Sequence, residues 1–233
     1  MLEKRRKSKL TNSYEDLGKR RDPNRALKRQ YRKYRSLGFI EALQSVLSPD
    51  DIVVDCGANI GEITGVLAET GAQIHAFEPE GFAFGKLSER CKDLPNVTLY
   101  NAAVGVEQGT LTLYKKKFFD KNPLAYSLTT TSLRPKEEEV QDYDVIETDV
   151  IDLPAFLAEQ TQLGRVAFLK LDIEGAELEI LENLVSGDLL TKIRATAAEI
   201  HPWLWPKKDR PRFKALRQIA TEHPEYHLNL DWF

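Results

Sequence analysis

The apolar residues of this chain follow two alternating spacings along most of its length. Runs dominated by β-branched and other apolar residues predict buried strands, and these runs lie at 52–55, 73–78, 97–100, 166–173, 193–200 and 226–230. Segments with apolar residues three and four positions apart predict helices, and they lie at 24–47, 63–67, 81–91, 152–163, 176–185 and 213–220. Strands that alternate with helices predict an α/β fold, a doubly wound and mostly parallel sheet with helices on both faces.

Residues 110–114 show a different pattern, because apolar and polar residues alternate there. This alternation predicts a half-buried antiparallel strand, and 145–150 is its expected partner. The polar segment 115–142 joins the two and contains Pro123 and Pro135. A connection of this length inside a compact domain usually has a function or is disordered.

The first part of the chain is strongly basic. Residues 1–36 contain 14 lysine and arginine residues against 4 acidic ones, a net charge of +10, whereas the whole chain carries −3. The helix predicted here would bury Leu27, Tyr31 and Tyr34. Its basic faces suit either solvent or an anionic partner, such as a lipid surface, a nucleic acid or a polyanionic substrate. We therefore divide the chain into a basic N-terminal arm and helix at 1–36 and a domain at 37–233.

The composition allows one substantial core, since the chain has 233 residues, 42% of them apolar and 30% charged. No apolar run reaches the roughly 18 residues that a membrane-spanning helix needs, so no transmembrane segment is expected. Cys56 and Cys91 show neither metal-ligand nor disulfide spacing, and both lie in patterns that predict burial. Small buried thiols are typical of a reducing compartment, which favours a cytoplasmic location.

The stretch I-V-V-D-C-G-A-N-I-G at 52–61 joins a predicted strand to a predicted helix through a turn that contains glycine. Strand, turn and helix in this order open a doubly wound sheet, and such sheets bind ligands at the carboxyl ends of their strands. Gly57 and Gly61 carry no Cβ, so they allow the backbone to pass close either to a ligand or to a neighbouring element. Asp55 ends the strand, where it would orient the turn or contact the ligand.

This turn departs from the dinucleotide-binding pattern, in which the glycines follow G-x-G-x-x-G. Asn59 occupies the second glycine position and Glu62 the third. A carboxylate there would repel the pyrophosphate that needs the helix N-terminus, whereas it suits a ligand with an ammonium group. Glu78, at the end of the second strand, is placed to accept hydrogen bonds from both hydroxyls of a ribose. A nucleoside that carries an amino acid fits both features, and S-adenosylmethionine is that molecule.

Four motifs follow one another along the domain. They are VVDCGANIGEIT at 53–64, FEPE at 77–80, NAAVG at 101–105 and LKLDIEGAELEIL at 169–181. Together they resemble the FkbM-like family of S-adenosylmethionine-dependent methyltransferases, and the similarity extends over 53–201. The resemblance implies a class I methyltransferase (Rossmann-like) sheet of seven strands, the last of them antiparallel. It also implies methyl transfer, usually to oxygen and often on a sugar, a polyketide or a related hydroxylated compound.

The resemblance also implies which residues hold the cofactor. The methionine part would lie among residues of the first turn, the ribose at the end of the second strand and the adenine beside the residues that follow the third. Glu62 and Asp172 are the acids expected near the ammonium group. With these two, the predicted cofactor residues are Asp55, Gly57, Asn59, Gly61, Glu62, Glu78, Asn101, Ala102 and Asp172. The basic arm and the 115–142 segment match no family motif, so the choice of acceptor is expected to reside there.

Asp172 and Glu174 end the most apolar predicted strand, which should be central and buried on both faces. If that strand stays extended, Lys170 shares a face with both acids. The alternative is that these acids and Glu177 cap the following helix. Two acids alone do not define a metal site, so no metal is predicted, although a divalent ion between them is an alternative because hard cations favour oxygen ligands.

His201 ends the next predicted strand and is the third predicted catalytic residue. A histidine with a pKa near 6.5 is a natural base for a hydroxyl acceptor, whereas the alternative is a hydrogen-bonded core residue. Asp172 heads the catalytic predictions, His201 is the best alternative base, and Glu174 is the next candidate.

The leading hypothesis is an O-methyltransferase that acts on a carbohydrate or another small hydroxylated metabolite. A nucleotide-cofactor oxidoreductase is opposed by Asn59 and Glu62. An RNA-directed or other polyanion-directed methyltransferase or binding protein is suggested only by the basic arm. The chain lacks the Asn/Asp-Pro-Pro-aromatic motif that amino-directed nucleic-acid methyltransferases commonly show, which makes nucleic acid the less favoured partner.

Overall fold

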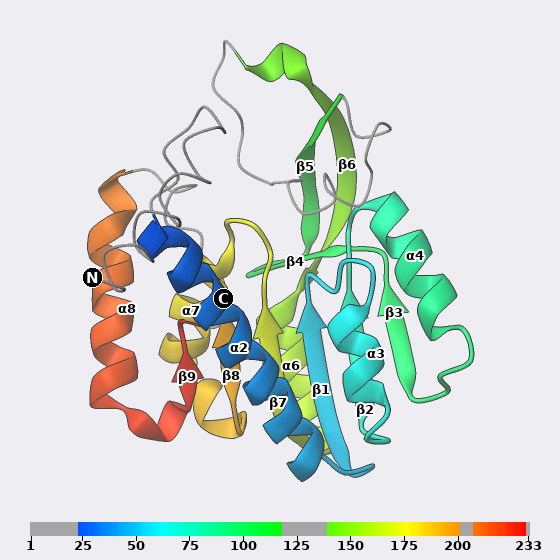
Figure 1. Ribbon diagram of the computed structural model, residues 1–233, viewed down its shortest axis with the longest axis vertical. Helices are drawn as coiled ribbons and strands as arrows, with labels where there is room; N and C mark the ends of the chain where they lie inside the picture. The colour runs from blue at the N-terminus through cyan, green and yellow to red at the C-terminus, as the bar shows by residue number, and fades with distance from the viewer. Residues whose placement is uncertain (1–22, 118–138, 201–206, 232–233) are drawn as a thin grey trace, which may run out of the picture.

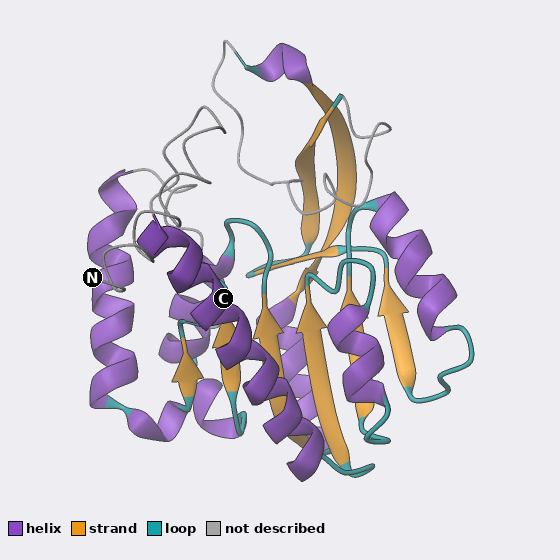
Figure 2. Ribbon diagram, in the orientation of Figure 1, coloured by secondary structure: helices purple, strands orange, loops and turns teal. Residues whose placement is uncertain are grey.

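The computed structural model describes residues 23–117, 139–200 and 207–231. A six-stranded sheet forms the centre of this part of the chain, in the order β3-β2-β1-β7-β8-β9 (Figures 1 and 2). Its strands are β1 Asp51–Cys56, β2 Gln73–Phe77, β3 Val97–Tyr100, β7 Arg165–Leu171, β8 Thr196–Ala198 and β9 Leu228–Asn229. Every neighbouring pair in this sheet runs parallel, which confirms the predicted doubly wound α/β fold.

The α-helices of the described residues cover both faces of this sheet (Figure 1). They are α2 Pro23–Val46, α3 Glu62–Ala68, α4 Gly81–Cys91, α6 Leu153–Leu163, α7 Glu177–Ser186 and α8 Arg210–Glu222. Successive side chains of β1 project to opposite faces. Val53 therefore packs with residues of α2 and α3, whereas Val54 packs with residues of α6 and α7. Both side chains are fully buried, as expected for a central strand of a parallel sheet.

The family resemblance implied seven strands with an antiparallel last strand, and the structure differs on both points. The described part of the main sheet has six strands, and β9 pairs with β8 in parallel. The connection explains the direction of β9. α8 lies between the two strands along the chain, and a helical crossover returns the chain so that the next strand runs parallel to the previous one.

A smaller sheet stands at the carboxyl ends of the main strands (Figure 1). It consists of β4 Ala103–Gly105, β6 Tyr143–Asp152 and β5 Gly109–Lys116, in the order β4-β6-β5. β5 and β6 pair antiparallel along the whole of β5, which confirms the predicted pairing of 110–114 with 145–150. We call β5 and β6 together the β5–β6 ribbon. The polar connection predicted at 115–142 is described only at its ends, since 118–138 lie outside the described residues.

The long basic helix α2 packs on the sheet through its C-terminal half, where the ring of Phe39 lies 5.7 Å from that of Phe168. The buried face predicted for its N-terminal half is wrong, because Leu27 and Tyr34 are 66% and 64% exposed. The Tyr31 side chain lies outside the described part of the structure. Helical spacing identifies an apolar stripe, but it does not say how far along the helix the rest of the domain extends.

α2 is continuous across residues 36 and 37, where the sequence placed the boundary between the basic arm and the domain. That division therefore falls inside one helix, and it stays a prediction. Residues 1–22, which hold part of the basic charge, lie outside the described residues. Among the helices that are described, α2 included, none is both long enough and apolar enough to cross a membrane.

Candidate functional site

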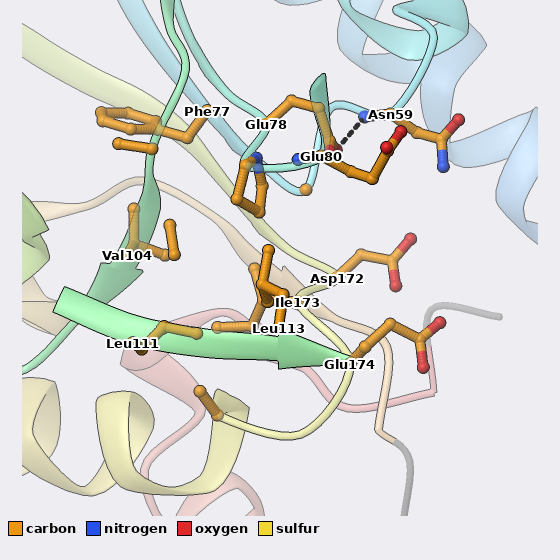
Figure 3. Close-up of a pocket in the computed structure, with 15 residues that line it drawn as sticks. Asn59, Phe77, Glu78, Glu80, Val104, Leu111, Leu113, Asp172, Ile173 and Glu174 are labelled. Carbon is orange, nitrogen blue, oxygen red and sulfur yellow. Dashed lines mark hydrogen bonds between the residues drawn. The ribbon is translucent and has the colours of Figure 1, made fainter. Parts of the chain in front are cut away.

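A pocket opens at the carboxyl ends of β1, β2 and β7, where a doubly wound sheet is expected to bind its ligand (Figure 3). Its polar lining consists of Asn59, Glu78, Glu80, Asp172 and Glu174. Its other lining residues are mainly apolar, namely Gly57, Phe77, Pro79, Ala102, Ala103, Val104, Leu111, Leu113, Ile173 and Ala176. In Figure 3 the labelled acidic side chains lie toward one side of the pocket and the labelled apolar side chains toward the other.

The turn after β1 is built on two glycines whose conformations require glycine. Gly57 has a φ of +77° and Gly61 a φ of +79°, a left-handed region that residues with a Cβ rarely adopt. A Cβ on Gly57 would lie 1.8 Å from the backbone oxygen of Asp172, and a Cβ on Gly61 would lie 2.7 Å from Leu87 Cδ1. Of the two interpretations of these glycines, close approach to a neighbouring element is therefore the one that the structure shows. Gly57 lines the pocket, whereas Gly61 is not part of its lining.

Glu78 lies where the ribose prediction requires a carboxylate. It follows β2, it lines the pocket, and the residue is only 6% exposed. Asn59 N donates to Glu78 Oε2 and Glu80 N donates to Glu78 Oε1, each at 2.8 Å (Figure 3). Burial raises the pKa of Glu78 to about 7, although both hydrogen bonds act to lower it. The carboxylate is thus fixed in direction, and each oxygen has capacity for a further donor.

Asp55 lies beneath the turn and is not part of the pocket lining. It is 1% exposed, Thr64 Oγ1 donates to its Oδ2 at 2.7 Å, and Lys170 Nζ lies 3.1 Å from its Oδ1. Thr64 belongs to α3, so Asp55 connects β1 to the helix on the other side of the turn. Of the two roles predicted for Asp55, this placement favours orientation of the turn.

Lys170 is a buried cation at this end of β7. Its Nζ donates to the carbonyl oxygen of Gly57 at 2.8 Å and lies 3.8 Å from Asp172 Oδ2. Burial alone would lower the pKa of Lys170, but the charges of Asp55 and Asp172 outweigh burial and hold that pKa above its ordinary value. The charged ammonium therefore links the first turn to the loop after β7. A lysine between apolar residues of a central strand was the sequence signal for such a pair, because a buried charge needs a partner.

The loop after β7 presents the predicted catalytic acids Asp172 and Glu174, which both line the pocket (Figure 3). β7 ends at Leu171, and Glu174 and Gly175 have φ values of +55° and +131°. A shared face from Lys170 to Glu174 was expected only if the strand stayed extended, and the left-handed backbone at Glu174 ends that extension, although Asp172 Oδ2 still lies 3.8 Å from Lys170 Nζ.

Glu177 holds this loop from the first turn of α7. The residue is fully buried, Ile173 N donates to its Oε1 at 3.2 Å, and Gly175 N donates to its Oε2 at 3.0 Å. Its carboxylate also lies at a helix N-terminus, where negative charge is favoured. The alternative expected for these acids was a helix cap, and the contacts of Glu177 show a related structural role, which is to hold the loop before α7. Asp172 and Glu174 face the pocket.

The remaining predicted residues lie in different places. Ala102 is buried and lines the pocket. Asn101 is exposed, and its Nδ2 donates to the carbonyl oxygen of Glu78 at 2.9 Å. It thus supports the loop that carries Glu78 from outside the pocket. Glu62 is exposed in the first turn of α3 and is not part of the lining. His201 lies outside the described residues.

The metal alternative gains no further ligand from the described part of the chain. Within 23–117, 139–200 and 207–231, no three His, Cys, Asp or Glu side chains are grouped so that they could hold a metal ion.

The apolar side of the pocket was not predicted from the sequence. Phe77 contributes to it from the end of β2, Val104 from β4 and Ile173 from the loop after β7. Leu111 and Leu113 contribute to it from β5. The alternation at 110–114 held the signal, since it places residues 111 and 113 on one face of a strand. It did not reveal that this face covers the pocket.

Comparison with known proteins gives a consistent assignment. A family model described as "Methyltransferase FkbM domain" matches residues 55–226, which confirms the resemblance inferred from the four motifs. "Methyltransferase 1" of Beauveria bassiana is 32% identical over 149 residues, which cover 58% of this chain and 59% of that protein. The chain thus spans less than two thirds of the length of that relative.

Two further relatives carry more specific names. "Hexuronic acid methyltransferase AglP" of Haloferax volcanii is 25% identical over 194 residues, which cover 83% of this chain and 73% of that protein. "31-O-demethyl-FK506 methyltransferase FkbM" of Streptomyces tacrolimicus is 26% identical over 182 residues, which cover 66% of this chain and 67% of that protein.

Proposed function

This chain belongs to the FkbM methyltransferase family, and from that premise we propose that it transfers a methyl group from S-adenosylmethionine to a hydroxyl group of a carbohydrate or another small hydroxylated metabolite. The observation that carries this proposal is the placement of Glu78. Its two carboxylate oxygens are fixed by backbone N–H groups, and the side chain lines the pocket at the carboxyl end of β2. Two acceptor oxygens in one direction suit the two hydroxyl donors of a ribose.

The other polar groups of the pocket fit the amino-acid end of the same ligand. Asp172 and Glu174 face the pocket from the loop after β7, and their charges would attract an ammonium group or a positively charged sulfur. The same acidic lining disfavours the pyrophosphate of a dinucleotide. These carboxylates oppose a dinucleotide, whereas Glu62 lies outside the lining.

When bound, S-adenosylmethionine would supply a methyl group that is activated for displacement because it is attached to a positively charged sulfur. The task of the chain is to hold the acceptor oxygen in line with that methyl group, and correct positioning of two reactants is worth roughly 7–11 kcal/mol. Asp172 is our first candidate for the base that takes the hydroxyl proton, a contribution of roughly 10²–10⁴-fold. The other candidates are His201, which lies outside the described residues, and Glu174, which lines the pocket.

The names of two relatives support an acceptor of this kind. One is a hexuronic acid methyltransferase and the other a 31-O-demethyl-FK506 methyltransferase. The first name specifies a carbohydrate, and the second specifies methylation at oxygen. We transfer to this chain only the chemistry that these acceptors suggest, an oxygen atom on a hydroxylated molecule.

Calorimetry provides the first test. We expect the protein to bind S-adenosylmethionine and S-adenosylhomocysteine with a Kd in the micromolar range, where ~1 μM corresponds to about −8 kcal/mol. Binding of NAD without binding of either sulfur ligand would overturn the proposal. Incubation with a cofactor that carries a labelled methyl group, across a panel of neutral sugars, uronic acids and other hydroxylated compounds, would then identify the acceptor and the methylated atom.

RNA or another polyanion is the second candidate acceptor, and it depends on the +10 charge of residues 1–36. Phosphate contacts would give an affinity that falls steeply with salt concentration, whereas a neutral sugar would give a shallow dependence.

We propose a cytoplasmic location, because Cys56 and Cys91 are buried and unpaired, as predicted, and such thiols are typical of a reducing compartment.

A further inference from the structure

One face of β5 is directed at the pocket. Leu111 and Leu113 line the pocket, and Leu113 is only 4% exposed. Two positions further along the strand, Lys115 Nζ lies 3.1 Å from Glu80 Oε1. Side chains two positions apart project from the same face of a strand, so this face of β5 presents two leucines and one lysine to the site. Thr112 belongs to the opposite face.

Glu80 connects this lysine to the loop that carries Glu78. Glu80 Oε2 accepts a hydrogen bond from Ala83 N at 2.8 Å, and Glu80 Oε1 accepts one from Lys115 Nζ. The backbone N–H of Glu80 donates to Glu78 Oε1 at 2.8 Å. The side chains of Lys115 and Glu80 are 18% and 3% exposed, so the pair is largely shielded from water, which strengthens the attraction. Two consecutive contacts therefore lead from the ribbon to the carboxylate that we assign to the ribose.

The two leucines lie on the same side of the pocket as apolar groups from the main sheet. Figure 3 shows Leu111 and Leu113 near Ile173, with Phe77 and Val104 beyond them. The flat face of an aromatic base packs well against apolar side chains of this kind. The base of a nucleoside is attached directly to its ribose. A ribose held by Glu78 would thus place the base within reach of this apolar side.

We propose that the β5–β6 ribbon forms one wall of the adenine site, with Leu111 and Leu113 in contact with the base and Lys115 as the positioning residue that fastens the wall to Glu80. This inference rests on the proposed function, because the base is that of S-adenosylmethionine. The turn after β1 and the loops after β2 and β7, which we call the rim of the parallel sheet, supply the polar contacts of the cofactor. The ribbon supplies apolar contacts. Cofactor affinity thus depends on an element that lies outside the parallel sheet.

Calorimetric titration of the full chain with S-adenosylhomocysteine tests the wall. Leu111→Ala removes a contact with the base, and Lys115→Met removes the ion pair. The matched controls are Thr112→Ala, on the opposite face of the same strand, and Lys117→Met, which removes the same charge at an exposed position. We expect Kd to rise about tenfold for Leu111→Ala and for Lys115→Met, the equivalent of about 1.4 kcal/mol. Each control should change Kd by less than about twofold.

A double-mutant cycle separates the ion pair from a general effect on stability. Glu80→Gln removes the charge and keeps an oxygen that can accept from Ala83 N. If Lys115 acts through Glu80, the double variant should bind about as tightly as the weaker single variant, so the two effects are not additive. If Lys115 only stabilises the fold, its replacement will lower the unfolding midpoint and leave Kd, measured well below that midpoint, unchanged.

The outcomes distinguish this inference from the proposed function. Kd values like that of the wild type for both Leu111→Ala and Lys115→Met would overturn the adenine wall while the proposed function stands. An equal loss of affinity in Lys117→Met, or additive effects in the cycle, would overturn the role of Lys115. Failure of the wild-type protein to bind S-adenosylhomocysteine would overturn the proposed function, and the wall with it.

Discussion

The pocket is assembled from two regions that are held in different ways, the rim of the parallel sheet and the β5–β6 ribbon. On the rim, the ion pair of Lys170 and Asp55 has side-chain exposures of 3% and 1%, and Lys170 also bonds the Gly57 carbonyl. On the ribbon, one shielded ion pair between Lys115 and Glu80 connects β5 to the rim. The rim is fixed by buried charges, whereas strand pairing, apolar packing and the Lys115–Glu80 pair hold the ribbon.

The difference has an energetic consequence. Removal of one partner from a buried ion pair leaves an uncompensated charge, which typically costs about 3–5 kcal/mol. Truncation of an apolar side chain in the wall, at a partly exposed position such as Leu111, costs less free energy. Substitutions on the rim should therefore affect folding and catalysis strongly, and substitutions on the ribbon should mainly adjust affinity.

The largest expected effect is the loss of the proposed base. Asp172→Asn keeps the shape of the side chain and removes its proton affinity, so turnover should fall roughly 10²–10⁴-fold. The measurement is single-turnover methyl transfer with saturating cofactor, once an acceptor is known. Glu179→Gln, which neutralises an exposed acid on α7, is the matched control. A near-normal rate for Asp172→Asn would move the base to Glu174 or show that positioning alone suffices.

The second effect concerns stability. Lys170→Met should lower the free energy of unfolding by about 3–5 kcal/mol, because Asp55 then remains charged and buried without its partner. The double variant Asp55→Asn with Lys170→Met should recover most of this loss, since both charges are absent. Urea unfolding measures the free energy of unfolding of the single and the double variant. Lys92→Met is the control, because the Lys92 side chain is 58% exposed and its ion pair lies on the surface. Equal stabilities of Lys170→Met and Lys92→Met would contradict the account of the rim.

The third effect concerns cofactor affinity. Glu78→Ala should weaken binding of S-adenosylhomocysteine by roughly 1.5–3 kcal/mol, the scale of hydrogen bonds to a charged group. Calorimetry measures the change, and Glu89→Ala, at a side chain that is 72% exposed on α4, is its control. An unchanged Kd would show that the ribose does not contact Glu78.

The fourth effect is a pH dependence of that affinity. Burial raises the pKa of Glu78 to about 7 in the free protein, so about a tenth of the molecules hold it ionised at pH 6 and about nine-tenths at pH 8. Ribose hydroxyls donate to the ionised form, which lowers the pKa of Glu78 in the complex. Affinity should therefore fall by up to about tenfold from pH 8 to pH 6. Glu78→Gln should lose this part of the dependence, and an identical pH profile in the variant would assign it to another group.

The rim was predictable from the sequence because its residues lie at or close to the carboxyl ends of predicted strands. Gly57, Glu78 and Asp172 follow buried runs, and the carboxyl ends of parallel strands must meet at one edge. One feature of the rim was not predictable. The turn through Glu174 depends on Glu177, whose carboxylate receives two backbone N–H groups of that loop. An acid early in a helix is too common to reveal such a role.

The ribbon shows the limit of periodicity more clearly. Alternation identified the strand and its partner, and it placed residues 111 and 113 on one face. It did not identify what that face covers, because the contact of Lys115 with Glu80 joins residues 35 positions apart. The same limit explains α2, where the spacing of Leu27 and Tyr34 indicated an apolar stripe but the contact with the sheet lies further along the helix.

The smallest expected effect is that of the basic N-terminal arm on the cofactor. Deletion of residues 1–22 leaves α2 intact, since α2 begins at Pro23, and among the described residues those that line the pocket lie at or after Gly57. The rim and the ribbon together should therefore retain the cofactor, with a Kd within about twofold of the wild type by calorimetry. If the arm instead contacts an anionic acceptor, the same deletion should weaken acceptor binding and make its salt dependence shallower. A large loss of cofactor affinity on deletion would show that a third region, besides the rim and the ribbon, completes the cofactor site.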